Sequence, residues 1–179
     1  MQKALTSGAV FADTRGVDEI LAGTVPGALA FPSRGKVATH AGWTYDPEND
    51  DADIVLLADG LEDAADMRDH MIRVGVDAAA AFVRTLDGLE LEPVPTVTAD
   101  ELKKKVAADE AGGPDSEADA VLVDVRNKTE FSAGTVADAM QLNAGKVLFH
   151  QDELPKDRQL VTFCPVSYTH LTLPTILRV

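Results

Sequence analysis

The sequence predicts an α/β fold of two units, each a parallel sheet with helices on both faces, the second of them truncated. Residues 9–32 and 120–143 align without a gap, and ten of these 24 positions are identical, which marks an internal repeat. Each copy opens with an uninterrupted apolar run, as expected for a strand buried on both faces. Each then continues in strand–helix–strand order with tight turns, which is typical of parallel sheets.

The same elements are predicted in both copies. A buried strand (9–12, 120–123) is followed by an Asp-x-Arg triplet (Asp13 to Arg15, Asp124 to Arg126). A short helix comes next, with Ile20 and Leu21 or Phe131 as its buried side chains. The glycine of an Ala-Gly pair (Gly23, Gly134) is expected to end that helix in the left-handed conformation. A second strand begins at 28–29 or 139–140.

The remaining pattern divides the chain into a first unit at 1–92, a linker at 93–97 and a second unit at 98–165. Apolar runs predict strands at 54–58 and 159–163, and apolar spacing predicts a helix at 62–74. Prolines mark the linker, and a capping box opens a helix at 99–108. Residues 109–119 are predicted to form an acidic loop.

Composition excludes several classes of function. The net charge of −14, from 30 acidic and 16 basic residues, disfavours nucleic acid and anionic membranes as partners. No apolar stretch reaches the roughly 18–20 residues of a membrane span, and the N-terminus has no signal-peptide pattern, so a cytoplasmic protein is expected. With one cysteine and four scattered histidines, the sequence predicts neither a metal site nor a cofactor.

The repeated motif, Asp-x-Arg-x-x-x-Glu-x-x-x-Gly-Thr-Val-x-x-Ala, followed by a buried strand ending in cysteine, resembles the rhodanese-like sulfurtransferases. Thr24 and Thr135 stand where the family has histidine. The resemblance covers residues 8–165 and implies that Cys164 is catalytic and carries sulfane sulfur as a persulfide. A small sulfur donor and a thiol or cyanide-like acceptor would be the partners. Strand alignment places Ala58 where the second unit has Cys164, so the first unit lacks a sulfur carrier.

A narrower resemblance rests on Thr39 to Trp43. This segment is similar to the first rhodanese unit of proteins that join a metallo-β-lactamase-fold domain to two C-terminal rhodanese units. It implies an upstream metallo-β-lactamase-fold domain as a partner. Trp43 is then expected to anchor one unit to the other or to that domain.

The position of Cys164 is itself informative. Backbone N–H groups of a loop after a strand, and the N-terminus of a following helix, stabilise a thiolate there. The alternative is a buried cysteine that only packs. The Asp-x-Arg triplets are expected to be architectural, with Asp accepting backbone N–H bonds and Arg126 pairing with Glu130. His40 and His150 are expected at the surface.

Residues 166–179 are predicted to be a non-native tail. Residues 165–179 contain no Asp or Glu, and Val166 to Leu171 resemble a translated sequencing adapter. The glycine- and arginine-containing loop and the helix of the family are missing. We therefore expect the chain as it stands to be inactive and the second unit marginally stable. Two rival functions stay open: a non-catalytic interaction module, and a phosphatase or arsenate reductase whose loop is about one residue longer to fit a tetrahedral oxyanion.

Overall fold

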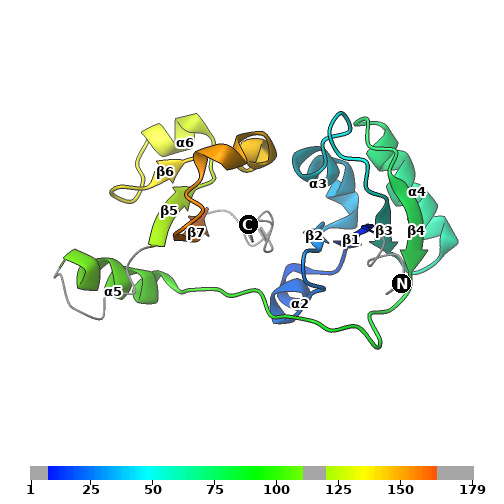
Figure 1. Ribbon diagram of the computed structural model, residues 1–179, viewed down its shortest axis with the longest axis horizontal. Coiled ribbons are helices and arrows are strands. Elements are labelled where there is room, and N and C mark those ends of the chain that lie inside the picture. Colours follow the sequence, from blue (N-terminus) through cyan, green and yellow to red (C-terminus); the bar gives the residue numbers. More distant parts are fainter. Residues whose placement is uncertain (1–7, 111–119, 165–179) are drawn as a thin grey trace.

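The computed structural model describes residues 8–110 and 120–164 and shows a mixed α/β fold with two parallel sheets. Its elements are β1 (Val10–Asp13), α2 (Val17–Ala22), β2 (Leu29–Ala30), η1 (Arg34–Lys36), α3 (Val37–Thr44), β3 (Ile54–Leu57), α4 (Leu61–Ile72), β4 (Ala79–Val83), α5 (Ala99–Glu110), β5 (Ala120–Asp124), α6 (Lys128–Ser132), β6 (Met140–Gln141), η2 (Ala144–Glu153) and β7 (Gln159–Phe163). The strand orders are β2-β1-β3-β4 and β6-β5-β7, and the parts of the chain that hold these two sheets are called the first and the second unit below. Figure 1 shows the two sheets in opposite halves of the picture, with α3 and the 3-10 helix η2 (orange) facing each other in its upper part.

The first sheet is buried on both faces. Alternate strand residues point to opposite sides. Ala12, Ile54 and Leu56 pack in one cluster with residues of α3 and α4, whereas Phe11, Val55 and Leu57 pack in another. The second cluster is completed by residues after α2 and after β4, namely Val25, Ala28, Leu86 and Leu89. The continuous apolar runs of β1 and β3 follow from this two-sided burial.

The second sheet packs mainly on one face. Val121 and Val123 of β5 join Val147 and Leu154 in a core that includes η2. The opposite face is more open: Val136 is 40% exposed, whereas Val25 at the same place in the first unit is 6% exposed. Among the described residues, nothing in the second unit corresponds to α4, β4 or the segment that covers Val25.

The strand registers relate the two sheets residue by residue. Phe11 pairs with Val55 in the first sheet, and Leu122 pairs with Val161 in the second. Carrying the pairing to the strand ends places Ala58 at the position equivalent to Cys164. The first unit therefore has a methyl group where the second has a thiol.

Four elements were not anticipated: η1, α3, β4 and η2. Two are 3-10 helices, whose short repeats leave little periodicity to detect. In α3, apolar residues are not confined to one face, and β4 is a half-exposed run of alanines before Phe82 and Val83. The predicted strands and helices lie within about two residues of the observed ones, the usual uncertainty of element boundaries.

Two local predictions were wrong. His40 is 3% exposed rather than at the surface, because α3 places its ring against Phe31 with centroids 6.1 Å apart. Gly23 ends α2 with φ 166°, which is extended backbone and not the left-handed conformation. A Cβ at Gly23 would lie 3.4 Å from Leu91 Cβ, an ordinary van der Waals contact, so space does not require glycine there either. Most of the predicted acidic loop and the whole predicted tail lie outside the described residues.

Candidate functional site

Each unit contains the same buried polar network at the carboxyl end of its first strand. In the second unit the Asp124 carboxylate is fully buried. It accepts hydrogen bonds from Arg126 Nε at 2.9 Å and from Thr135 Oγ1 at 2.7 Å, and Arg126 Nη2 donates to the carbonyl of Gly134 at 2.7 Å. The network therefore ties the end of β5 to the turn after α6.

The first unit repeats these bonds with Asp13, Arg15, Gly23 and Thr24. Arg15 Nε donates to Asp13 at 2.9 Å, Thr24 Oγ1 donates to Asp13 at 2.7 Å, and Arg15 Nη2 donates to the Gly23 carbonyl at 2.6 Å. Because the network is intact beside Ala58 as well as beside Cys164, its common role is architectural, as predicted. The predicted pairing partner of the arginine was wrong: Arg126 binds Asp124, while Glu130 accepts a bond from the Asn127 backbone.

The network fixes the charge state of its members. Hydrogen bonding to Arg126 lowers the pKa of Asp124, and the bond from Thr135 acts in the same direction. The hydrogen bond to Asp124 raises the pKa of Arg126, with smaller contributions from the charges of Asp124, Glu130 and Cys164. The site therefore holds an ionised carboxylate and a permanent guanidinium cation next to the thiol.

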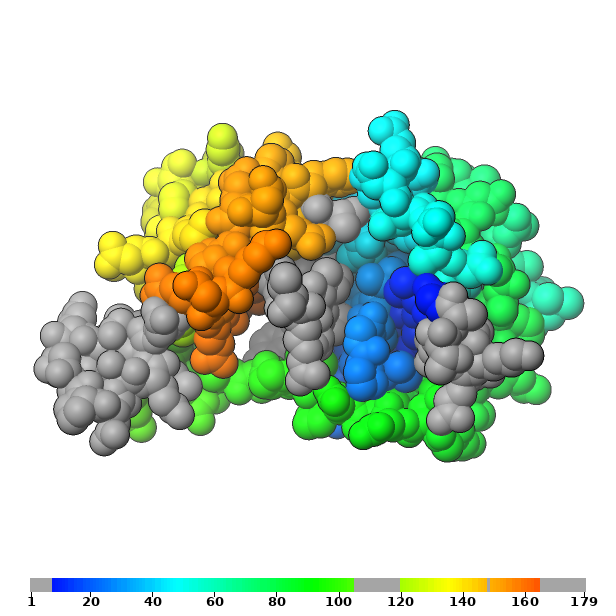
Figure 2. Space-filling model, in the orientation of Figure 1, coloured from blue at the N-terminus to red at the C-terminus, as the bar shows by residue number. Residues whose placement is uncertain are grey.

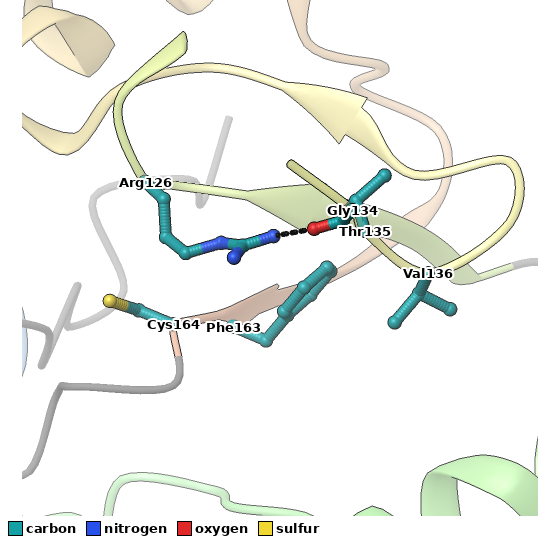
Figure 3. Close-up of a pocket in the computed structure, with 6 residues that line it drawn as sticks. All are labelled: Arg126, Gly134, Thr135, Val136, Phe163 and Cys164. Carbon is teal, nitrogen blue, oxygen red and sulfur yellow. Dashed lines mark hydrogen bonds between the residues drawn. The ribbon is translucent and has the colours of Figure 1, made fainter. Parts of the chain in front are cut away.

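Cys164 follows β7 directly and lies at one side of a cavity of about 430 Å³. The other residues around this cavity are Arg126, Gly134, Thr135, Val136 and Phe163. Figure 3 shows Arg126 reaching toward the Gly134 carbonyl, with Cys164 and Phe163 at the end of the neighbouring strand. A thiol, a cation and an apolar wall thus meet at the carboxyl edge of a parallel sheet, which is where α/β folds place their ligands.

The first unit has a cavity of about 500 Å³ at the equivalent edge. Three arginines (Arg15, Arg34, Arg84) and two acids (Glu19, Asp59) line it. Ala58 is buried there, and no cysteine is present, because the chain has only Cys164. This cavity therefore has no thiol nucleophile.

The sequence predicted Cys164 as the site residue, but it did not predict that Arg126 lies beside it. The signal was present, since β5 and β7 are adjacent parallel strands whose carboxyl ends meet at one edge. The described residues hold no group of three or more His, Cys, Asp or Glu side chains that could bind a metal ion. They also hold no helix that is long and apolar enough to cross a membrane.

Comparisons with known proteins bear on part of the chain. No protein-family model matches the sequence. A 46-residue stretch, 26% of the chain, is 39% identical to a sulfurtransferase of Allochromatium vinosum and spans 43% of that protein. This stretch is sulfurtransferase-like. A solved structure, the thiosulfate sulfurtransferase of Pseudomonas aeruginosa, aligns with 91% of the chain at 21% identity and a TM-score of 0.38. The chain covers 37% of that structure, so it spans less than half the length of either protein.

The role of Arg126 can be tested against a matched residue. We expect Arg126→Gln to slow alkylation of Cys164 by iodoacetamide by up to about fivefold, because it removes a positive charge beside the thiol and solvent screens part of that charge. Arg15→Gln breaks the same network in the first unit, does not touch the cavity beside Cys164, and should leave the rate unchanged. Arg126→Lys, which keeps the charge, should restore most of the rate. Equal slowing by Arg15→Gln would show that general destabilisation, not the local charge, sets the reactivity.

Proposed function

We propose that this chain is a rhodanese-type sulfurtransferase module in which Cys164 carries sulfane sulfur as a persulfide. The observation that carries the proposal is the place of Cys164, at the carboxyl end of β7 beside Arg126 and open to a cavity. The sulfurtransferase-like stretch supports the same class of chemistry. The first unit, with Ala58 at the equivalent position, takes no direct part in the chemistry.

The geometry suits a two-step transfer by covalent catalysis. The Cys164 thiolate attacks the outer sulfur of a donor such as thiosulfate. An Sγ–S bond forms, the donor S–S bond breaks, and its electron pair leaves with sulfite. An acceptor nucleophile, cyanide or a thiolate, then attacks the terminal sulfur and releases the Cys164 thiolate, so no external oxidant or reductant is needed. Arg126 places positive charge where anionic donors approach the thiol.

A loading experiment tests this proposal. After incubation with thiosulfate or a small-molecule persulfide, the full chain should gain one sulfur atom at Cys164, detected by mass spectrometry of the peptide that contains it. Cyanide should remove that atom as thiocyanate. Cys164→Ser should gain nothing. The chain unfolded in urea is the second control, and loading no faster in the folded state would contradict the proposal and favour a non-catalytic interaction module.

Turnover is a separate expectation. We expect the 179-residue chain to load sulfur slowly and to show no measurable cycling from thiosulfate to cyanide, because residues 165–169 contain neither glycine nor arginine to surround the persulfide. Resequencing the gene beyond codon 164 and assaying the chain with the sequence so found is the direct check. Turnover by the chain as it stands would overturn this expectation.

The wider setting of the module is also a proposal. An upstream metallo-β-lactamase-fold domain that produces or consumes persulfide would be a suitable partner, working in the cytoplasm with a small thiol as sulfur acceptor. Sequencing the gene upstream of codon 1 tests this. An open reading frame without metal-ligand histidine motifs would remove the partner and leave the sulfurtransferase proposal unchanged.

A further inference from the structure

The two units meet through a contact between the tryptophan of one and a glycine of the other. Trp43 lies on α3 in the first unit, and Gly145 lies in the first turn of η2 in the second. A Cβ atom built on Gly145 would lie 2.8 Å from Trp43 Nε1, 3.1 Å from Cδ1 and 3.2 Å from Cε2. The five-membered ring of the indole therefore rests directly on the Gly145 backbone, and α3 packs against η2. In Figure 2 the orange atoms of η2 meet the cyan atoms of the first unit in the upper middle of the molecule.

Glycine is required at position 145 by space and not by backbone conformation. Gly145 does not have a positive φ, unlike Gly27, Gly75, Gly88 and Gly134. Any residue could therefore adopt its backbone angles. Real Cβ atoms essentially never approach other heavy atoms within 3.0 Å, so a side chain at 145 would displace the indole.

Trp43 is fixed from its own side by an aromatic stack. The His40 ring meets the Trp43 ring edge-on, with centroids 6.1 Å apart and planes at 69°. His40 in turn lies against Phe31, which is completely buried in the first core. The stack Phe31–His40–Trp43 therefore runs from the core of the first unit to the backbone of the second.

Gly145 is equally well fixed in the second unit. Its N–H donates to Asn143 Oδ1 at 3.1 Å, which caps η2. Val147, two residues along η2, is buried in the second core, and Ala144 packs in the same cluster as Cys164. A displacement of η2 would therefore change the packing around the Cys164 thiol.

We propose that Trp43 and Gly145 form a docking contact that holds the two units as one body, with the first unit acting as the support of the cysteine-bearing unit. The partner of the Trp43 surface is thus η2 of the same chain. A tryptophan ring buries a large apolar area on a bare backbone segment, and this area stabilises the contact. The inference does not depend on sulfur transfer, since it concerns only how the units are joined.

The chain offers one tryptophan and one cysteine, and this makes the test specific. With a fluorescent acceptor on Cys164, energy transfer from Trp43 measures the separation of the units. Gly145→Ala should lower the transfer efficiency, shift Trp43 emission to the red and raise its quenching by acrylamide. Gly35→Ala is the matched control, because a Cβ there meets nothing within 4 Å and Gly35 also lies in a 3-10 helix with no positive φ. Equal values for the two variants would overturn the proposal.

A second variant distinguishes loss of docking from local misfolding of η2 caused by the Gly145 substitution. Trp43→Leu leaves the second unit unaltered, and hydrogen exchange of the amides of 144–154 then reports on docking. Faster exchange there, with unchanged exchange in β3 and β4, is expected. Exchange in η2 identical to that of the unaltered chain would contradict the proposal, whatever the result of the fluorescence experiment.

Discussion

Replacing Asp124 by alanine should destabilise the second unit by about 3 kcal/mol, since removing one partner of a buried ion pair leaves the other charge uncompensated. Arg126 would lose the three hydrogen bonds that its side chain donates to the carboxylate, and Thr135 would lose its acceptor. Hydrogen exchange of the β5 and β6 amides measures the effect within the second unit. Asp152→Ala, an exposed acid on η2, is the control and should change stability by less than about 0.5 kcal/mol. Similar exchange in the two variants would show that the network is dispensable.

The same network predicts a pH dependence with a definite sign. The pKa of Asp124 is lower in the folded chain than its usual value of about 3.9. The unfolded chain therefore binds the proton more readily, and the stabilising effect of Asp124 is complete above pH of about 4 and is lost as the pH falls through the folded pKa. Asp124→Asn should be less stable at neutral pH and should lose less stability on acidification. Parallel acid curves for the two proteins would contradict this.

Replacing Phe31 by alanine should cost the first unit about 3–5 kcal/mol, the usual loss for a buried phenylalanine. Phe31 is fully buried between the sheet and His40, and its loss removes the base of the stack under Trp43. Urea unfolding followed by Trp43 emission measures both the lost stability and the altered indole environment. Phe149→Ala is the control, because Phe149 is 54% exposed and its removal should be nearly neutral. Comparable losses in both variants would show that the stack is not a structural element.

Prediction from the sequence succeeded where the burial of an element leaves a recognisable pattern in its own residues. The runs before Asp13 and Asp124 are apolar because both faces of β1 and much of β5 are buried, and this burial is visible as a continuous run. Prediction failed where contacts between distant parts of the chain determine the environment of a residue. Nothing in the short sequence around His40 shows that α3 turns this ring inward, and nothing around Gly145 shows that an indole lies above it. Cys164 could be proposed from its place after a strand, whereas Arg126 required the pairing of β5 with β7.

The polar network also shows which residues of a unit are hard to replace by substitution. Its aspartate, arginine, glycine and threonine are identical in the two copies, whereas several of the larger apolar residues around it differ: Phe11 corresponds to Leu122, Ala12 to Val123 and Ile20 to Phe131. Apolar packing has no directional requirement, so a larger side chain at one position can be compensated by a smaller one at a neighbouring position. A set of directed hydrogen bonds cannot be altered one member at a time without leaving a buried charge unpaired. Copies of this unit are therefore expected to keep these polar residues longer than they keep the large apolar residues of their cores.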